Sequence, residues 1–252
     1  MSVPAGRAQA KPGVPTRLSF RLVCLGGSRG GRSGAVPGPP LGGALIRNQS
    51  SEGYVRRFGP TERALHWIHA SAFLALLVTG LVLYLPSLST AISRRGTVKE
   101  LHLAAAIGWL VAVVAVVSFG DRAALRRTAR EIETIDRDDR SWLRGRHAPQ
   151  GRFNAGQKLN AILTAAFTVL FAVSGILLWL GEKDTRFRLD GTVVLHDALM
   201  WASLVLLTGH LYLALVHPTT RHALRGMTLG EVREDWAAQH HAKWVAAERE
   251  RR

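Results

Sequence analysis

The stretch from Thr192 to His217 constrains the fold of this chain more than any other part of its sequence. It reads TVVLHDALMWASLVLLTGHLYLALVH and contains one acid, Asp197, and no lysine or arginine. A helix needs roughly 20 mainly apolar residues to cross a hydrocarbon layer of ~30 Å, and this stretch has that length. We therefore expect a membrane-spanning helix here.

Two histidines lie inside this stretch, His196 and His210, 14 residues apart. In an α-helix that spacing leaves the two side chains within about 40° of one face and about 21 Å apart along the axis. One face of the helix would then present an imidazole near each side of the membrane. This arrangement is suited to two metal centres placed one above the other across a bilayer.

Three other apolar runs resemble this one in length. The predicted helices cover about 65–85, 101–119, 159–180 and 192–216. None shows the alternation of a β-barrel strand, and runs with so few charges do not fit the surface of a soluble helical bundle. The predicted fold class is an all-α membrane protein, a bundle of four transmembrane helices within residues 53–244.

The segments outside the bundle differ in composition. Residues 1–52 are rich in Gly, Pro, Ser and Arg and have no sustained apolar pattern, so we expect a disordered extension. Residues 245–252 are expected to form a basic tail. The 120–147 segment alternates Arg with Asp and Glu, which predicts an amphipathic helix on the membrane surface with its charges in solvent.

The distribution of positive charge predicts the orientation. The net charge is +15, and 27 of the 33 Lys and Arg residues fall in the N-terminal segment, the 120–158 loop and the C-terminal tail. The 86–100 and 181–191 loops hold the other six. By the positive-inside rule both termini and the 120–158 loop are cytoplasmic. Because the apolar residues are clustered into spans, membrane lipids are the expected partner of the basic segments, and nucleic acid is not.

Cysteine usage limits the cofactors that the chain can hold. The only cysteine, Cys24, lies outside every apolar run. The chain therefore cannot form an internal disulfide, a Cys-rich zinc or iron–sulfur site, or a C-x-x-C-H haem attachment. Any redox cofactor must be held by histidine or by weak contacts.

Four histidines lie at useful depths in the apolar runs. Depth pairs His102 with His196 near the outer side and His66 with His210 near the inner side. Two imidazoles from facing helices are what a six-coordinate b-type haem requires, so the pattern predicts two haem b groups with the four histidines as iron ligands.

Other interpretations of these histidines remain open. A lone intramembrane histidine often only hydrogen-bonds a neighbouring helix. Structural zinc needs four ligands at one depth, and proton relays usually place an acid beside histidine, where only Asp197 qualifies. His69, one turn after His66, is an alternative ligand. His217 lies at the inner boundary, where it would reach headgroups, a quinone or a haem propionate.

Several other residues have two interpretations each. One glycine per predicted helix allows either close approach of a flat macrocycle or simple helix packing; these are Gly80, Gly108, Gly175 and Gly209. His240 and His241 are adjacent and point about 100° apart on a helix, so we expect a surface or subunit contact and not a shared ion.

The stretch RFNAGQK before the third run also has two interpretations. Asn154 and Gln157 match a helix-capping arrangement. Their amides and nearby backbone groups would alternatively bind the carbonyl oxygens of a quinone near the inner haem. Lys158 would then supply charge or protons, or extend to the headgroups.

The motifs ERALHW, KELHLAAAIGW, RFNAGQKLN, VLHDAL, GHLYLALVHP and RGMTLGEVREDWAAQHHAKW occur in this order between about Val55 and Trp244. Together they resemble the cytochrome b (gamma) subunit of membrane-bound formate dehydrogenase. Related cytochromes b of nickel–iron hydrogenases and other b561-like, quinone-linked oxidoreductases share the four-helix di-haem plan and are the alternative. A haem-free transporter or scaffold belongs to a different class.

The resemblance implies ligation of two b haems by the pairs His102–His196 and His66–His210. It implies a menaquinone or other quinone site at Asn154, Gly156, Gln157 and His210. It also implies an iron–sulfur (beta) subunit, a molybdenum- or tungsten-pterin catalytic (alpha) subunit, and a location as a multi-pass protein of the bacterial inner membrane. Formate would be oxidised in the alpha subunit, and electrons would pass through this chain to quinone in a respiratory chain.

Overall fold

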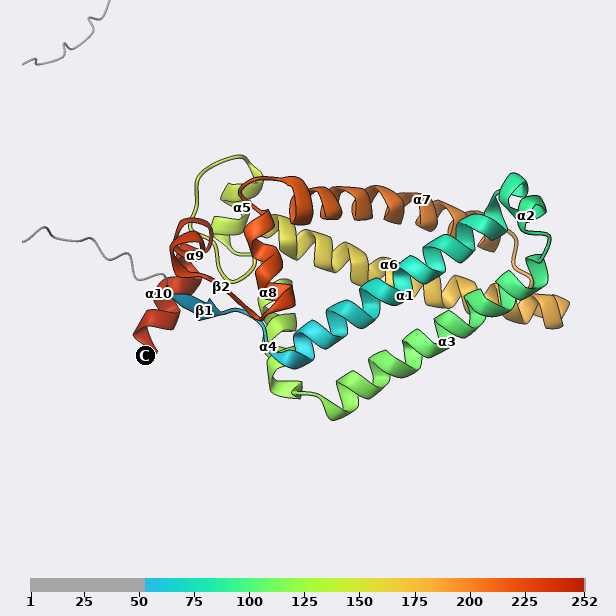
Figure 1. The fold of residues 1–252 in the computed structure, drawn as a ribbon, viewed down its shortest axis with the longest axis horizontal. Helices are drawn as coiled ribbons and strands as arrows, with labels where there is room; N and C mark the ends of the chain where they lie inside the picture. The colour runs from blue at the N-terminus through green and yellow to red at the C-terminus, as the bar shows by residue number, and fades with distance from the viewer. Residues whose placement is uncertain (1–52, 252) are drawn as a thin grey trace, which may run out of the picture. The chain divides into compact units, whose positions relative to one another are not determined.

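Four long helices dominate the computed structural model, which describes residues 53–251 (Figure 1). They are α1 (Pro60–Tyr84), α3 (Arg95–Phe119), α6 (Ala155–Lys183) and α7 (Thr192–Leu211), and α7 continues into a π-helical turn, η2 (Tyr212–Val216). The predicted extension 1–52 lies outside the described residues.

Local sequence explains where these helices begin and end. Pro60 occupies the first turn of α1, and Pro86 follows directly after its C-cap. Asn154 caps α6, and Gly191, with φ +84°, precedes α7 in the left-handed region. The first three helices start four to six residues before the predicted apolar runs, because their first turns are polar.

All four helices are long and apolar enough to cross a membrane. Their outward side chains are largely exposed: Val111, Val169, Val194 and Val205 each expose more than 60% of their surface. So much exposed aliphatic surface is costly in water and favourable in lipid. The four predicted spans are therefore confirmed as helices.

The helices form two hairpins. α1 packs along α3, and α6 packs along α7 (Figure 1). Side chains connect the hairpins: the rings of Tyr84 on α1 and Trp201 on α7 meet edge to face with centroids 5.9 Å apart, and a Cβ on Gly80 would lie 4.0 Å from Sδ of Met200. α7 therefore faces α1 and α3 mainly through long side chains.

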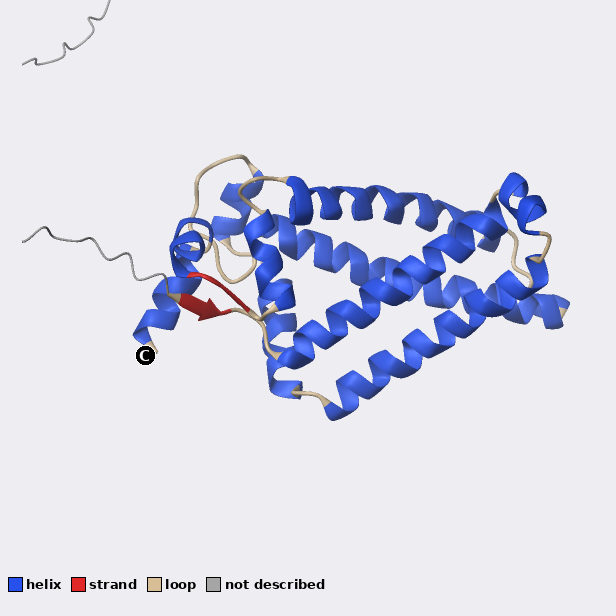
Figure 2. Cartoon of the chain, in the orientation of Figure 1, coloured by secondary structure: helices blue, strands red, loops and turns tan. Residues whose placement is uncertain are grey.

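The connections at the two ends of the bundle differ (Figures 1 and 2). One end has only the short helix α2 (Pro86–Ile92) and the turn η1 (Thr185–Phe187). All other described elements lie at the opposite end and form a polar cap. They are β1 (Tyr54–Arg56), α4 (Arg122–Glu133), α5 (Arg137–Leu143), η3 (Arg221–Ala223), α8 (Leu224–Thr228), β2 (Glu231–Arg233), α9 (Glu234–His240) and α10 (Ala242–Glu250). The first and last described residues thus both lie at the end of the bundle that carries the polar cap.

The polar cap has its own small core. β1 and β2 pair antiparallel, with Val55 opposite Val232, so the fold is not purely helical. These valines pack with Trp236, Trp244 and Val245, all less than 9% exposed. The predicted boundary after residue 244 thus falls inside α10, whose first turn contributes to this core.

The charged 120–147 segment differs from the expectation of one helix with solvated charges. It forms two helices, because Asp136 caps α5 after a break at the end of α4. Asp139 is 2% exposed and accepts a 2.6 Å hydrogen bond from the ammonium of Lys158, itself 7% exposed. A lone buried charge is unfavourable, so this pair fixes α5 against the first turn of α6.

His241 also differs from the expected surface contact, since it is 1% exposed. Its Nδ1 lies 2.7 Å from the carbonyl oxygen of Gly151 and therefore carries the proton. Its Nε2 accepts from Nη2 of Arg57 at 3.2 Å. Burial, with Arg57 adding to it, lowers the pKa of His241 to about 3. The same buried contact joins the start of the described chain, the segment before α6, and the C-terminus.

A neutral buried His241 predicts loss of stability in mild acid. The unfolded chain takes up a proton below pH ~6.5, whereas folded His241 does not until about pH 3. Stability should therefore fall as pH drops through this window, by about 2 kcal/mol from pH 7 to pH 5. Tryptophan fluorescence during denaturant unfolding in detergent measures this slope.

The variant His241→Gln should flatten that pH dependence. The matched variant His147→Gln removes an exposed imidazole and should keep the wild-type slope. Equal slopes in His241→Gln and wild type would contradict the assignment of the acid sensitivity to His241.

Candidate functional site

α7 brings its two histidines against the histidines of the other hairpin. The ring centroids of His102 and His196 lie 6.5 Å apart at an interplanar angle of 68°. Those of His66 and His210 lie 6.3 Å apart at 55°. The two pairs predicted from depth are thus the two pairs that the fold brings together.

The spacing within each pair fits one metal ion between two imidazoles. A histidine nitrogen binds a metal at about 2.0–2.1 Å, and a ring nitrogen lies about 1.1 Å from its ring centre. Two axial imidazoles on one metal therefore have centroids about 6.3 Å apart. The observed 6.3 and 6.5 Å match that value. Both pairs have the right chemistry and spacing for bis-histidine ligation of haem.

Two hydroxyl groups orient the rings of the His102–His196 pair. Oγ1 of Thr79 lies 2.8 Å from Nδ1 of His102, and Oγ of Ser174 lies 2.8 Å from Nδ1 of His196. With Nδ1 engaged, Nε2 of each ring is the nitrogen left for a metal. Such partners fix the ring orientation and tune the ligand.

Thr79 and Ser174 were not singled out from the sequence. Each hydroxyl also donates to a carbonyl one turn earlier, Thr79 to Ala75 at 2.7 Å and Ser174 to Leu170 at 2.7 Å. That bond is common for Ser and Thr inside helices. A single hydroxyl in an apolar run therefore does not indicate that it contacts a histidine on another helix.

The glycines divide into two groups. A Cβ on Gly80 would lie 3.5 Å from Cε1 of His102, and one on Gly175 would lie 3.6 Å from Cε1 of His196. A Cβ at either position would thus make an ordinary van der Waals contact with the imidazole. Gly108 and Gly209 meet nothing within 4 Å. These distances leave the macrocycle and the helix-packing interpretations open at all four glycines.

The alternative histidines point elsewhere. His69 stacks on Phe73 at 6.3 Å and meets Trp109 edge to face at 5.9 Å. His217 has its Nδ1 3.1 and 3.2 Å from the hydroxyls of Thr219 and Thr220. Across residues 53–251 no group of three or more His, Cys, Asp or Glu side chains is placed to hold one ion, so a four-ligand zinc site gains no support.

The NAGQK stretch forms the capping arrangement that the sequence allowed. Oδ1 of Asn154 accepts from the backbone N–H of Gln157 at 2.9 Å, and Oε1 of Gln157 accepts from the backbone N–H of Asn154 at 3.1 Å. Arg57 also donates to Gln157 at 3.2 Å. A Cβ on Gly156 would lie 3.1 Å from the ring of Trp142, so this glycine permits tight packing.

Comparison with known proteins identifies the family of this chain. Residues 57–230 match the family model described as prokaryotic cytochrome b561. The chain belongs to the prokaryotic cytochrome b561 family. All four histidines of the two pairs lie within the matched region. Membership in this family, together with four helices able to span a bilayer, makes the chain a membrane-bound cytochrome b and identifies haem b as its class of cofactor.

Curated relatives narrow the comparison. This cytochrome b561 family member is 28% identical to the formate dehydrogenase cytochrome b556(fdo) subunit of Escherichia coli K12, over 75% of this chain and 90% of the relative. It is 26% identical to the nitrate-inducible formate dehydrogenase cytochrome b556(Fdn) subunit of the same strain, over 73% and 86%. It is 24% identical to the formate dehydrogenase cytochrome b556 subunit of Haemophilus influenzae, over 79% and 85%.

Proposed function

We propose that this chain is the membrane cytochrome b subunit of a formate dehydrogenase complex and transfers electrons from an iron–sulfur subunit through two b haems to menaquinone or another quinone. Two pairs of imidazoles carry the proposal: their ring centroids lie 6.3 and 6.5 Å apart, and the pairs lie at two depths of one four-helix bundle. The names of the curated relatives support formate dehydrogenase as the complex.

The residues of this chain have defined roles in the proposal. His66 and His210 hold one haem, and His102 and His196 hold the other. The bound haems would supply one-electron carriers at two depths of a layer ~30 Å thick, too wide for one efficient electron transfer. The hydroxyls of Thr79 and Ser174 fix the orientation of the rings in the His102–His196 pair. The surrounding aliphatic side chains exclude water.

The charge bias supports an orientation. Because 27 of 33 Lys and Arg residues belong to the N-terminal, 120–158 and C-terminal segments of the sequence, we assign the polar cap and both termini to the cytoplasm of a bacterial inner membrane. His66 and His210 then lie near the cytoplasmic side, where quinone takes up protons. The iron–sulfur subunit delivers electrons at the other side, and a molybdenum- or tungsten-pterin subunit oxidises formate. A hydrogenase as the donor complex is the alternative, and the largest subunit that co-purifies distinguishes the two.

Haem content is the main test. The purified chain should show a reducible b-type spectrum and two haems per chain in a pyridine haemochrome assay. His210→Ala should leave one haem, still reducible from the partner subunit, and should abolish quinone reduction. His69→Ala is the matched control within the same bundle and should keep two haems.

A chain without a b-type spectrum would refute the proposal and favour a haem-free transporter or scaffold. One haem in the wild type would refute the two-pair assignment. Loss of a haem in His69→Ala but not in His66→Ala would show that His69, and not His66, is the haem ligand on α1.

The hydroxyl partners give a second prediction. Thr79→Val and Ser174→Ala each remove the hydrogen bond to an imidazole Nδ1 and should weaken haem binding at the His102–His196 pair by about 10–100-fold. The change should appear as a shifted midpoint potential or lowered occupancy of one haem only. Thr208→Val removes a hydroxyl on α7 that bonds only the Leu204 carbonyl and should leave both haems unchanged.

The quinone assignment to Asn154, Gly156, Gln157 and His210 needs a variant that separates binding from capping. Asn154→Asp keeps an oxygen acceptor for the α6 cap but removes the amide donor. If Asn154 binds quinone, this variant should reduce quinone several-fold more slowly while its thermal stability and haem reduction match wild type. Asn154→Ala should instead lose about 1 kcal/mol of stability. Wild-type quinone reduction in Asn154→Asp would limit this residue to capping.

A further inference from the structure

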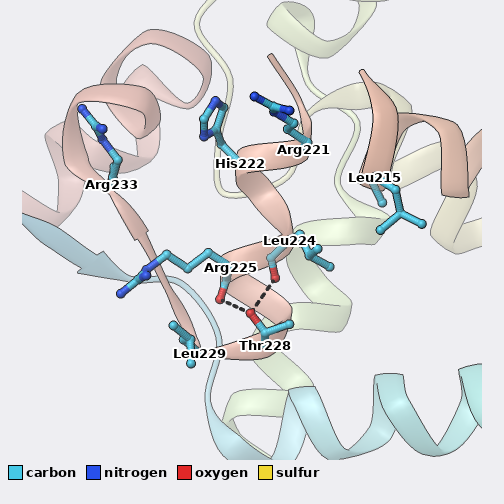
Figure 3. A pocket seen from close by; sticks show the side chains of 9 residues that line it. Leu215, Arg221, His222, Leu224, Arg225, Thr228, Leu229 and Arg233 are labelled. Carbon is cyan, nitrogen blue, oxygen red and sulfur yellow. Dashed lines mark hydrogen bonds between the residues drawn. The ribbon is translucent and has the colours of Figure 1, made fainter. Parts of the chain in front are cut away.

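A hollow of about 470 Å³ lies where the fourth span ends and the polar cap begins (Figure 3). Leucine side chains form much of its wall: Leu215 from the π-helical turn η2, Leu224 from α8, and Leu229 just after α8. Arg221, His222, Arg225 and Arg233 add cationic or titratable groups, of which Arg233 is paired with Asp235, and no acidic side chain lines the hollow. It is distant in sequence from α6 and contains none of the proposed haem ligands.

The hollow lies at the boundary between apolar and polar surface. Leu215 and Val216, the last residues of the span, are 54% and 62% exposed. Arg221 and His222 follow after five and six residues and are exposed as well. A side chain that suits hydrocarbon and one that suits phosphate thus line the same depression, at the depth where lipid headgroups meet acyl chains.

Hydrogen bonds hold the turn that presents Arg221. The backbone N–H of Arg221 donates to the carbonyl of His217 at 3.1 Å, and the Thr220 hydroxyl donates to the carbonyl of Leu213 at 2.6 Å. Nε1 of Trp236 donates to the carbonyl of Thr219 at 2.7 Å, so the polar cap supports the turn from behind. The cationic edge is therefore placed by the fold.

The charges around the hollow are only partly neutralised. Arg225 pairs with Glu231 at 2.6 Å and lies 4.2 Å over the ring of Tyr54. Arg221 and His222, by contrast, have no side-chain hydrogen bond or ion pair with any residue in the range 53–251, and both extend from η3 in Figure 3. An exposed guanidinium and an imidazole beside an apolar wall can donate to phosphate oxygens without breaking an existing pair.

We propose that this hollow binds one anionic phospholipid, with the headgroup phosphate at Arg221 and His222 and an acyl chain along Leu215. Inorganic phosphate shares the phosphate chemistry but would leave the leucine wall unused. Lys and Arg side chains near a membrane surface attract anionic lipid headgroups. The site is independent of haem ligation and of the quinone assignment.

Lipid titration of the purified full-length chain in detergent tests the site. Phosphatidylglycerol should raise the unfolding temperature at lower concentration than phosphatidylcholine. The double variant Arg221→Gln/His222→Gln should bind phosphatidylglycerol at least about five-fold more weakly. Arg221→Lys, which keeps the charge, should bind nearly as wild type. Arg94→Gln/His147→Gln makes the same substitutions at exposed positions outside the hollow and should leave the affinity unchanged.

Three outcomes would overturn the proposal. The first is equal phosphatidylglycerol affinity in wild type and the Arg221→Gln/His222→Gln variant. The second is an equal loss in the control double variant, which would show a general effect of net charge. The third is stabilisation by inorganic phosphate at the same phosphate concentration as strong as by phosphatidylglycerol, which would assign the hollow to a free anion. Circular dichroism confirms that each variant is folded before titration.

Discussion

Polar side chains are costly inside hydrocarbon, and this constraint explains why α7 organises the bundle. A histidine within a span is therefore most favourable where something engages its ring nitrogens. The fold faces each imidazole of α7 with one from α1 or α3, at a spacing that a shared metal ion would fit, and places the hydroxyls of Thr79 and Ser174 against Nδ1 of the two rings in one pair. The exposed aliphatic surface elsewhere on the helices suits contact with lipid.

The polar cap joins three distant parts of the chain where the bundle ends: the segments around Arg57, Arg152 and His241. Arg57 donates to the carbonyl of Arg152 at 2.6 Å and to the imidazole of His241, while Arg152 donates to Glu62 at 2.8 Å. Burial, with Arg152 adding to it, lowers the pKa of Arg57 to about 9. These buried charges are paired with carbonyl, carboxylate or ring acceptors, and the network sets the position of the α6 N-terminus through Gln157.

The sequence predicts those features that depend on one segment at a time. Length and apolarity predict the four spans, and 14-residue spacing on one helix predicts two depths for histidine. The sequence leaves open which of His66 and His69 lies beside His210, because that depends on how α1 packs against α7. In the fold the His66 ring pairs with His210, and the His69 ring packs against Phe73 and Trp109. The ion pair of Asp139 with Lys158 and the strand pair of Val55 with Val232 are likewise tertiary: each residue alone resembles an ordinary surface charge or loop valine.

The end of α7 connects the histidine-bearing part of the bundle to the cationic edge of the hollow. After Leu211 the hydrogen bonding shifts to the wider π pattern, and the N–H of His217 bonds the carbonyl of Tyr212. A π turn adds a residue to the turn and rotates whatever follows relative to an ideal helix. His210 lies before this change and keeps its alignment with His196, while Arg221 lies after it. The imidazole spacing therefore depends on the regular helix, and the position of the cationic edge depends on the irregular turn. A change that regularised this turn would move Arg221 without moving His210.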